Sequence, residues 1–480
     1  MIRGRLAAST LGDLLGDWRR DGTGGLPAYE ALAERIRLLL IDGRISADVR
    51  LPSERELSER LDLSRTTITA AYRQLRDSGY ARAVQGSGTT TTLPLARPPA
   101  TAPRSQVIDL TMAALPATSL LPAAAALATE ELAAHYDTPG YQLIGVPALR
   151  EAIAERYTAR GLPTDPEQIL VTSGAQGAIT LLSRTFVTRG DRVFADSPSY
   201  PHAYDALASA GGRIVTSPVT PEDGWDTASL AATIGRTNPS LAYVMPDFHN
   251  PTARSMTLDD RHELLHAVAK VDTLLIADET TGELDIDRRE HYGPLATLAG
   301  EHGARVVHIG SASKLLWGGL RIGWIRASAD ILGRVAAVRP AHDLGSPVWE
   351  QLVAAHLVRR SGEAIEERRS QLRERRGALA DALARHLPDW EMPERLEGGL
   401  AAWVRLPAPV SSQVTLAARA HGIHLTAGPR FGIDGAYERR LRFPLTSPAT
   451  LTQAVAILGE LWPTVADTTP LRLTTSEPSV

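Results

Sequence analysis

The sequence predicts a multidomain protein in which a small α+β unit precedes a large α/β domain. Short amphipathic segments within residues 26–94 are followed by two β segments rich in threonine. Beyond a proline-rich stretch, apolar β segments alternate with helical segments over residues 109–465, which is typical of an α/β fold. The chain of 480 residues is long enough for two or three domains.

Composition marks the boundaries between these parts. The stretch LARPPATAPRSQ combines proline, alanine and small polar residues, as interdomain linkers do. The closing stretch VADTTPLRLTTSEPSV is similar and is expected to form a mobile tail. We therefore expect five segments: an N-terminal extension at 1–25, the small unit at 26–94, a linker at 95–108, the large domain at 109–465 and a flexible tail at 466–480.

Overall composition is ordinary for a globular protein, with 43% hydrophobic residues, 22% charged residues and a net charge of −4. The chain has no cysteine, which excludes disulfides, cysteine-rich zinc sites and thiolate catalysis and fits a reducing compartment. The N-terminus lacks the apolar core of a signal peptide, and no apolar run is long enough to span a membrane. We expect a cytoplasmic protein with no membrane anchor and no metal site.

Three helices are predicted in the small unit. The first is indicated by apolar residues at helical spacing: Tyr29, Leu32, Ile36, Leu39 and Leu40. Ser53 and Glu56 have the spacing of a capping box, so a second helix should begin at Ser53 and end near Leu61. After a short turn, Ser64 is placed to cap a third helix that ends before Gly79.

The second and third helices form a helix-turn-helix, and the segment after them predicts a wing. The sequence YARAVQGSGTTTT is a strand, a glycine-rich turn and a strand of β-branched residues. On the third helix, Arg65, Thr69 and Arg73 lie away from the apolar face. Thr66 and Thr67 occupy the N-terminal end, where recognition helices meet base edges and phosphates.

Charge alone does not identify a DNA-binding unit, because residues 26–92 hold ten arginines against nine acidic residues. A dimerisation or protein-docking module is the alternative. However, the run LPSERELSERLDLSRTTITAAYRQLRDSGY with its GSGT turn resembles the winged-helix domain of GntR-type transcriptional regulators. The resemblance implies these DNA-facing positions: Arg55, Ser64, Arg65, Thr66, Thr67 and the wing turn at Gly86.

In the large domain the scarcity of lysine is informative. The chain has 49 arginines and two lysines, Lys270 and Lys314. Arginine replaces lysine in most roles, but it cannot lose its proton and form a Schiff base with an aldehyde such as pyridoxal phosphate. The pattern therefore favours a chemical role for at least one lysine, the alternative being that both are surface residues without one.

Other segments supply what a pyridoxal phosphate site needs. The run QILVTSGAQGAITLL is a strand, a turn and a helix, and the backbone N–H groups at its helix N-terminus suit a phosphate: those of Gly174, Ala175 and Gln176. Tyr200 follows a strand and could stack on a flat ring, and Asn250 lies in a similar loop. Asp278 ends the strand LLIAD, where its carboxylate could pair with a pyridine nitrogen.

Lys314 itself follows the apolar strand RVVHIG, with Ser311 and Ser313 before it. Arg321 comes seven residues later and could balance a phosphate dianion. Each of these matches alone also fits an ordinary turn, cap or loop. Their order carries more weight than any one of them.

This order resembles that of fold-type I aminotransferases from about residue 109 to 465. Together with the winged helix, the chain resembles the MocR subfamily of GntR-type regulators. The resemblance implies a large α/β pyridoxal phosphate-binding domain with a small C-terminal α/β subdomain. It also implies that Lys314 is the Schiff-base lysine and that Lys270 has no such role.

Further roles follow only from the resemblance. Arg442 occupies the place of the arginine that binds the α-carboxylate of a substrate or effector, the alternative being an ordinary ion pair. Tyr141 resembles a tyrosine that reaches across a dimer interface to the neighbouring cofactor phosphate. Thr280 stands where relatives often have a tyrosine that contacts the phenolic oxygen of the cofactor. Because threonine is too short for that contact, we expect transamination to be weak or absent.

We therefore expect a homodimeric, pyridoxal phosphate-dependent transcriptional regulator that binds operator DNA and senses an amino compound or pyridoxal phosphate itself. One alternative is an active aminotransferase with an appended helix-turn-helix. Another is a regulator whose large domain has lost the cofactor and serves only for dimerisation. The sequence identifies neither the operator, nor the effector, nor the sign of regulation.

Overall fold

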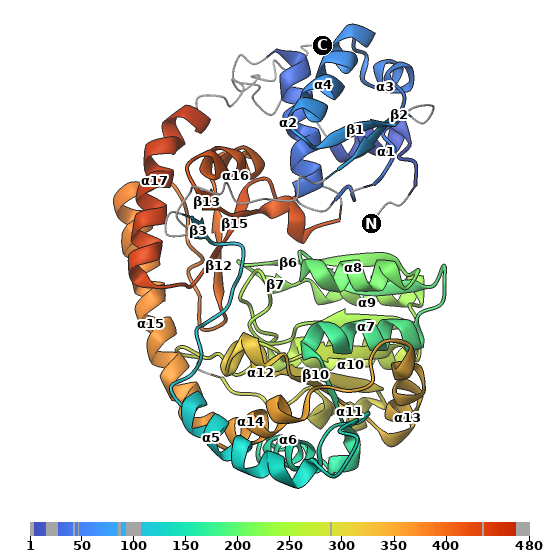
Figure 1. The fold of residues 1–480 in the computed structure, drawn as a ribbon, viewed down its shortest axis with the longest axis vertical. Coiled ribbons are helices and arrows are strands. Elements are labelled where there is room, and N and C mark those ends of the chain that lie inside the picture. Colours follow the sequence, from blue (N-terminus) through green and yellow to red (C-terminus); the bar gives the residue numbers. More distant parts are fainter. Residues whose placement is uncertain are drawn as a thin grey trace, which may run out of the picture.

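The computed structural model describes residues 4–15, 27–41, 44–46, 48–84, 88–92, 107–288, 290–433 and 436–466. In Figure 1 the small N-terminal domain, drawn in blue, lies at one end of the molecule beside the C-terminal subdomain, drawn in red. The strands and helices of the large domain form the other end. None of the described helices is long and apolar enough to cross a membrane.

The small domain is a winged helix-turn-helix. Its elements are α1 (Ala8–Leu15), α2 (Ala28–Ile41), α3 (Glu54–Leu61), α4 (Arg65–Asp77), β1 (Ala81–Val84) and β2 (Gly88–Thr91). Ser53 and Glu56 form the predicted capping box of α3, and Ser64 caps α4. The two wing strands pair antiparallel, while Gly86, the predicted turn position, lies outside the described residues.

Residues assigned to an N-terminal extension belong to this domain. Leu6, Leu11 and Leu15 are buried in the same core cluster as the apolar faces of α2 and α4. The backbone at Leu6 also bonds to the carbonyl of Arg50, at 2.8 Å. The domain core therefore begins upstream of residue 26.

The large domain is built on an eight-stranded sheet in the order β4-β11-β10-β9-β8-β5-β6-β7. The strands are β4 (Ile169–Thr172), β5 (Arg192–Ser197), β6 (Arg213–Thr220), β7 (Gly224–Trp225), β8 (Leu241–Val244), β9 (Leu274–Asp278), β10 (Val306–Ser311) and β11 (Gly323–Arg326). The central pairs, from β6 through β5, β8 and β9 to β10, are parallel. The pairs formed by β7, β11 and β4 are antiparallel.

Helices cover both faces of this sheet (Figure 1). The helices of this domain are α5 (Leu121–Glu131), α6 (Pro147–Ala159), α7 (Gly174–Phe186), α8 (Pro201–Ser209), α9 (Thr227–Thr237), α10 (Leu258–Lys270), α11 (Ala296–His302), α12 (Ala312–Leu315), α13 (Ala329–Val338) and α14 (Val348–Arg359). Along β9, Leu274 and Ile276 enter one core cluster while Leu275 and Ala277 enter another. Because both faces of the sheet are buried, the strand is apolar throughout and does not alternate between apolar and polar residues.

The C-terminal subdomain contains α15 (Ser361–His386), β12 (Ala401–Arg405), α16 (Ser411–Ala420), β13 (Ile423–His424), β14 (Thr426–Ala427), β15 (Arg440–Pro444) and α17 (Pro448–Ala466). Its antiparallel sheet has the order β12-β15-β14. A separate parallel pair joins β13 to β3 (Ile108–Asp109), so the first residues after the interdomain stretch join this subdomain. The residues predicted to form the tail lie outside the described part of the chain from 467 onward.

Candidate ligand cavity and DNA-facing helix

A cavity of about 800 Å³ opens where several strands of the large sheet end, against the C-terminal subdomain. The carboxyl ends of parallel strands are a recurrent place for ligands in α/β proteins. Nine of the residues predicted to form the site line it: Ala175, Gln176, Tyr200, Asn250, Asp278, Ser311, Lys314, Arg321 and Arg442. The structure therefore brings together residues that are up to 267 positions apart, from Ala175 to Arg442.

Lys314 lies on α12, directly after β10, and is partly buried. Its Nζ donates a hydrogen bond to the carbonyl of Ala113, at 2.9 Å. Burial lowers the pKa of Lys314 to about 8, with the Arg442 charge acting in the same direction. The amine is thus closer to its neutral, nucleophilic form than an ordinary lysine. Lys270 is exposed at the end of α10, away from the residues that line the cavity.

Asp278 ends β9 and is buried at the cavity. The Tyr243 hydroxyl donates to Oδ2 at 2.7 Å, and the backbone N–H of Thr280 donates to Oδ1 at 2.9 Å. The Thr280 hydroxyl donates to the same Oδ1. Burial raises the pKa of Asp278, and these hydrogen bonds oppose that shift. Thr280 lines the cavity as well, and its short side chain is used to hold the carboxylate in place.

Tyr243 was not predicted as a site residue, because it stands in the apolar strand LAYV and resembles core. Its only signal in the sequence is the hydroxyl, since a buried tyrosine usually finds a hydrogen-bond partner.

The N-terminus of α7 and Arg321 form the end of the cavity suited to an anion. Arg321 donates to the carbonyl of Ser173, at 3.3 Å. Gly174 has a φ of +76°, and a Cβ there would lie 2.8 Å from Arg321 Nη2. Only glycine therefore permits this approach of the guanidinium to the helix N-terminus. Gly174 itself is buried beneath the cavity residues Ala175 and Gln176.

Arg442 lies on β15, is 6% exposed and faces the cavity. Its Nη2 donates to the carbonyl of Thr111, and its guanidinium lies 5.0 Å from the centre of the Phe431 ring. Burial lowers the pKa of Arg442 to about 10. No salt bridge joins it to a described carboxylate, whereas the neighbouring Arg440 pairs with Glu222 at 2.7 Å.

Several polar atoms at the cavity are buried and have no hydrogen-bond partner within the described parts of the chain. They are Gln176 Oε1, Asn250 Oδ1, Ser313 Oγ and Arg442 Nε. Leaving buried polar atoms unpaired is costly, so folded proteins keep few of them. Their concentration at one cavity fits a polar ligand that would complete their hydrogen bonds.

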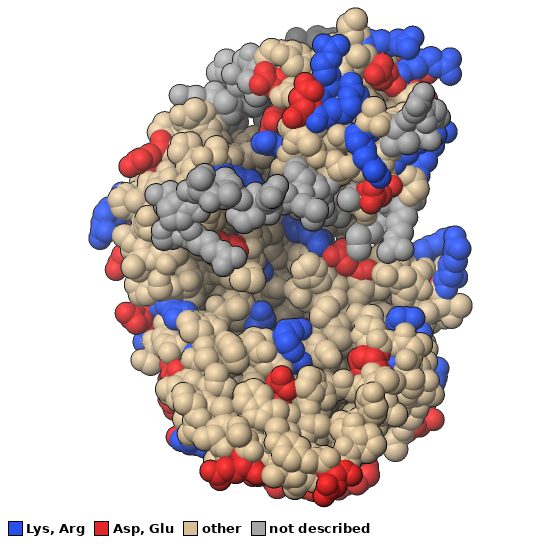
Figure 2. Space-filling view, in the orientation of Figure 1, with Lys and Arg blue, Asp and Glu red and all other residues tan. Residues whose placement is uncertain are grey.

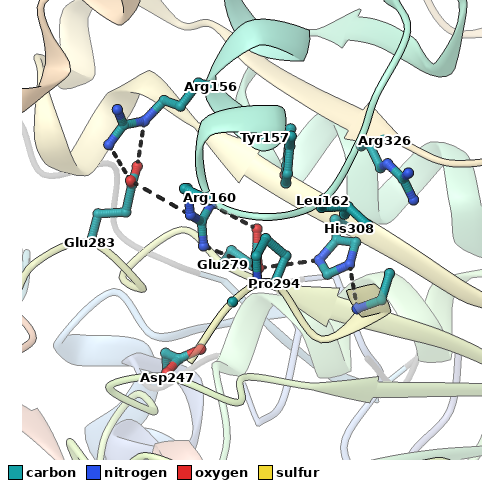
Figure 3. Close-up of polar contacts among 12 residues, drawn as sticks. Arg156, Tyr157, Arg160, Leu162, Asp247, Glu279, Glu283, Pro294, His308 and Arg326 are labelled. Carbon is teal, nitrogen blue, oxygen red and sulfur yellow. Dashed lines mark hydrogen bonds and ion pairs between the residues drawn. The ribbon is translucent and has the colours of Figure 1, made fainter. Parts of the chain in front are cut away.

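A buried network around Glu279, the residue that follows Asp278, was not predicted (Figure 3). Glu279 pairs with Arg160 at 3.3 Å and lies 3.2 Å from His308 Nδ1. His308 Nε2 accepts the N–H of Ala296 at 3.1 Å. Arg160 and His308 hold the pKa of Glu279 well below its usual range, although burial opposes them. The network links α6, β9 and β10, and so fixes the strand ends that carry Asp278 and Ser311.

Tyr141 does not line the cavity within this chain. Its side chain is 70% exposed, in a segment where other large apolar side chains are exposed as well: Tyr136, Leu143 and Ile144. A contact with a neighbouring subunit remains a prediction.

Four of the predicted DNA-facing residues, 64–67, form the start of α4. Ser64 Oγ accepts the N–H of Thr67 at 3.1 Å and lies 2.7 Å from the hydroxyls of Thr66 and Thr67. Arg65 is exposed and forms no side-chain hydrogen bond or salt bridge with the described residues. Arg55 is also exposed, 4.0 Å from Glu59. Figure 2 shows basic side chains over this small domain at the top, with acidic ones among them.

Comparison with known proteins supports the description of the small domain and that of the large domain. Residues 28–90 match the family of bacterial regulatory proteins called the gntR family, and residues 105–458 match aminotransferase class I and II. The probable rhizopine catabolism regulatory protein MocR of Rhizobium meliloti is 29% identical over 450 residues, covering 85% of this chain and 87% of that protein.

One sequence relative and one solved structure, both from Thermus thermophilus, resemble the large domain. A 2-aminoadipate transaminase is 31% identical over 341 residues, covering 68% of this chain and 83% of the relative. The crystal structure of an α-aminoadipate aminotransferase complexed with N-(5'-phosphopyridoxyl)-L-leucine superposes with a TM-score of 0.68 at 27% identity. That match covers 75% of this chain and 93% of the solved one.

Proposed function

Because the chain belongs to the aminotransferase class I and II family and carries a gntR-family domain before it, we propose that it is a DNA-binding transcriptional regulator of the MocR type. The observation that carries this proposal is the joint presence of the two domains, in the order found in a regulatory relative matched over 85% of this chain. The winged helix would supply the output on DNA, and the large domain would supply the sensor.

The cavity residues fit pyridoxal phosphate as the sensor's cofactor. When bound, this cofactor supplies an aldehyde that a lysine amine can engage and an electron-withdrawing ring. Lys314 has the lowered pKa that favours such an amine, and Asp278, buried at the cavity, would face the ring nitrogen. Arg321 and the N-terminus of α7 would bind the phosphate. The unpaired polar atoms at the cavity support a ligand of this polarity.

An amino compound carrying a carboxylate is the effector we favour, with Arg442 as its carboxylate partner. The Arg442 side chain is buried, faces the cavity and has no described carboxylate to neutralise it. Pyridoxal phosphate itself is the other candidate effector. Either ligand can regulate DNA binding only if it favours one arrangement of the protein over another.

An active aminotransferase with an appended DNA-binding domain is the second candidate function, favoured by the 31% identity to a transaminase. Thr280 weighs against fast turnover, because its hydroxyl is engaged by Asp278 and it offers no long side chain to the cavity. A large domain that only dimerises is the weakest candidate, since it leaves the unpaired cavity atoms unexplained.

A homodimer is proposed as the working form, with the exposed apolar side chains around Tyr141 as part of its interface. A DNA partner would be met in the cytoplasm, so we place the protein there. The proposed division keeps the DNA-binding domain up to residue 94 and the large domain at 109–465, with α1 added to the former because its leucines are in that core.

The test of the proposal uses one preparation of the full chain. Visible absorbance after addition of pyridoxal phosphate reports cofactor binding, and selection from random-sequence DNA followed by a mobility-shift titration reports DNA binding. We expect both signals. Rapid turnover of an amino donor with a keto acid, without sequence-selective DNA binding, would favour the aminotransferase instead.

A further inference from the structure

We propose that the chain holds a second ligand site, for Zn²⁺ or a similar divalent transition metal, formed by His262, Glu301 and His302. His262 lies on α10, and the other two residues end α11. One ligand atom from each of the three lies within 4.8 Å of the others. This site is separate from the cavity and does not depend on the function proposed for it.

The chemistry of the three side chains suits zinc. Imidazole nitrogen and carboxylate oxygen are among its ordinary ligands, at about 2.0–2.2 Å. At those bond lengths tetrahedral ligand atoms lie about 3.3 Å apart. His262 Nδ1 and His302 Nε2 are already 2.9 Å apart, so only a small opening of the pair would admit the ion.

In the metal-free pair one of these two nitrogens must carry the proton that they share. Binding of the ion would displace that proton to the other nitrogen of the same ring, so that two lone pairs face the metal. A water molecule would take the fourth position.

A further histidine lies near the site without belonging to the three proposed ligands. His262 and His266 belong to the run HELLH, in which two histidines stand four residues apart on one helix. This spacing places both imidazoles on one helix face and occurs at zinc sites for that reason. The ring of His266 lies 6.4 Å from that of His302, so a third imidazole borders the site.

The position of the site gives the metal a structural consequence. α10 leads directly into β9, which carries Asp278, and α11 leads into β10, which carries Ser311. The two helices pack against each other. An ion bound to both would tie together the elements that precede these strands, and it would stabilise the folded state by mass action.

The experiment is a calorimetric titration of the tag-free full chain with ZnCl₂ after removal of metal by EDTA. We expect about one strong site per chain. His262→Ala and His302→Ala should each weaken zinc affinity by about tenfold or more. Loss of a residue that only hydrogen-bonds to a metal ligand already has an effect of about this size. His421→Ala, which removes an exposed histidine from the end of α16, is the matched control and should bind like the parent.

A second readout separates loss of the site from loss of the fold. Zn²⁺ should raise the melting temperature of the parent and of His421→Ala but not of His302→Ala, while the circular dichroism of all three stays the same. Equal zinc affinity in the parent and both ligand variants would overturn the proposal. So would a parent protein that takes up no zinc.

Discussion

Arg35 on α2 and Glu438, two residues before β15, form an ion pair of 2.9 Å between the winged helix and the C-terminal subdomain. Both side chains are largely buried, with 10% and 13% exposed. Glu438 also accepts the N–H and the hydroxyl of Ser412, at 2.9 and 2.7 Å. Arg442 lies four residues further along the chain, so the DNA-binding domain contacts the segment that leads into the strand carrying the proposed effector arginine.

Replacing Arg35 should loosen the contact between the two domains. Arg35→Ala leaves the Glu438 carboxylate without its cation, which costs at least about 1–3 kcal/mol, the penalty for a buried polar group left unpaired. Hydrogen–deuterium exchange should therefore speed up in α2 and around Ser412. Arg37→Ala on the same helix removes a pair with Glu34 inside the domain and serves as the control. Equal exchange around Ser412 in both variants would show that the ion pair does not hold the domains together.

The lysine assignment gives a spectroscopic prediction. Lys314→Ala should abolish the visible absorbance of the pyridoxal phosphate-loaded protein, because no other amine lines the described cavity. Lys270→Ala should leave the spectrum intact, since that side chain is exposed at the end of α10. Borohydride reduction followed by peptide mapping identifies the modified residue. An unchanged spectrum for Lys314→Ala would remove the cofactor assignment.

The pKa of Lys314 predicts how cofactor loading depends on pH. Burial lowers this pKa to about 8, so the fraction of neutral amine rises as the pH increases through 8 and then levels off. The initial rate of appearance of the visible band should follow the same curve. A lysine with its ordinary pKa, about 10.4, would instead give a rate that keeps rising beyond pH 9. Stopped-flow absorbance between pH 6.5 and 9.5 distinguishes the two curves.

Asp278 and its partner Tyr243 should act on the cofactor through the ring nitrogen. Asp278→Ala removes the counter-charge, so retention of pyridoxal phosphate should fall and the absorbance maximum should shift. Tyr243→Phe removes one hydrogen bond of 2.7 Å to the carboxylate, worth about 1.5–3 kcal/mol to a charged acceptor. Tyr243→Phe should therefore lower cofactor affinity too, but by less than Asp278→Ala does. Dialysis with absorbance readout measures both, and parental behaviour of Asp278→Ala would mean that the site lies elsewhere.

Local features of this protein could be predicted from its sequence because neighbouring residues determine them. The capping serines Ser53 and Ser64, and the turn at Gly174, each depend on residues within a few positions. The leucines of α1 carried a similar signal, since Leu11 and Leu15 stand one turn apart, but the segment is too short for its packing to be evident.

Contacts between distant residues could not be predicted in this way. The Tyr243–Asp278 bond, the Glu279–His308 pair and the Arg35–Glu438 pair each join separate elements. In the sequence, Tyr243 and His308 have the surroundings of ordinary strand residues, and only the order of strands in the sheet places them beside carboxylates.

The last prediction concerns DNA. Arg65 begins α4, is exposed and forms no side-chain salt bridge with a described residue, so its charge is available to a ligand. Arg65→Ala should reduce operator affinity by about 1–3 kcal/mol and relax the preference at one base if the contact is to a base edge. If the contact is to phosphate, the slope of log affinity against log salt concentration should become shallower by about one, and the sequence preference should stay the same.

Arg334→Ala on α13 in the large domain changes the charge equally and is the control. Cofactor absorbance should be the same in both variants, because Arg65 lies in the winged helix and contributes nothing to the cavity. Undiminished DNA binding by Arg65→Ala would remove this residue from the interface, and a lost absorbance band would mean that the winged helix and the cavity are more tightly coupled than the contact at Arg35 implies.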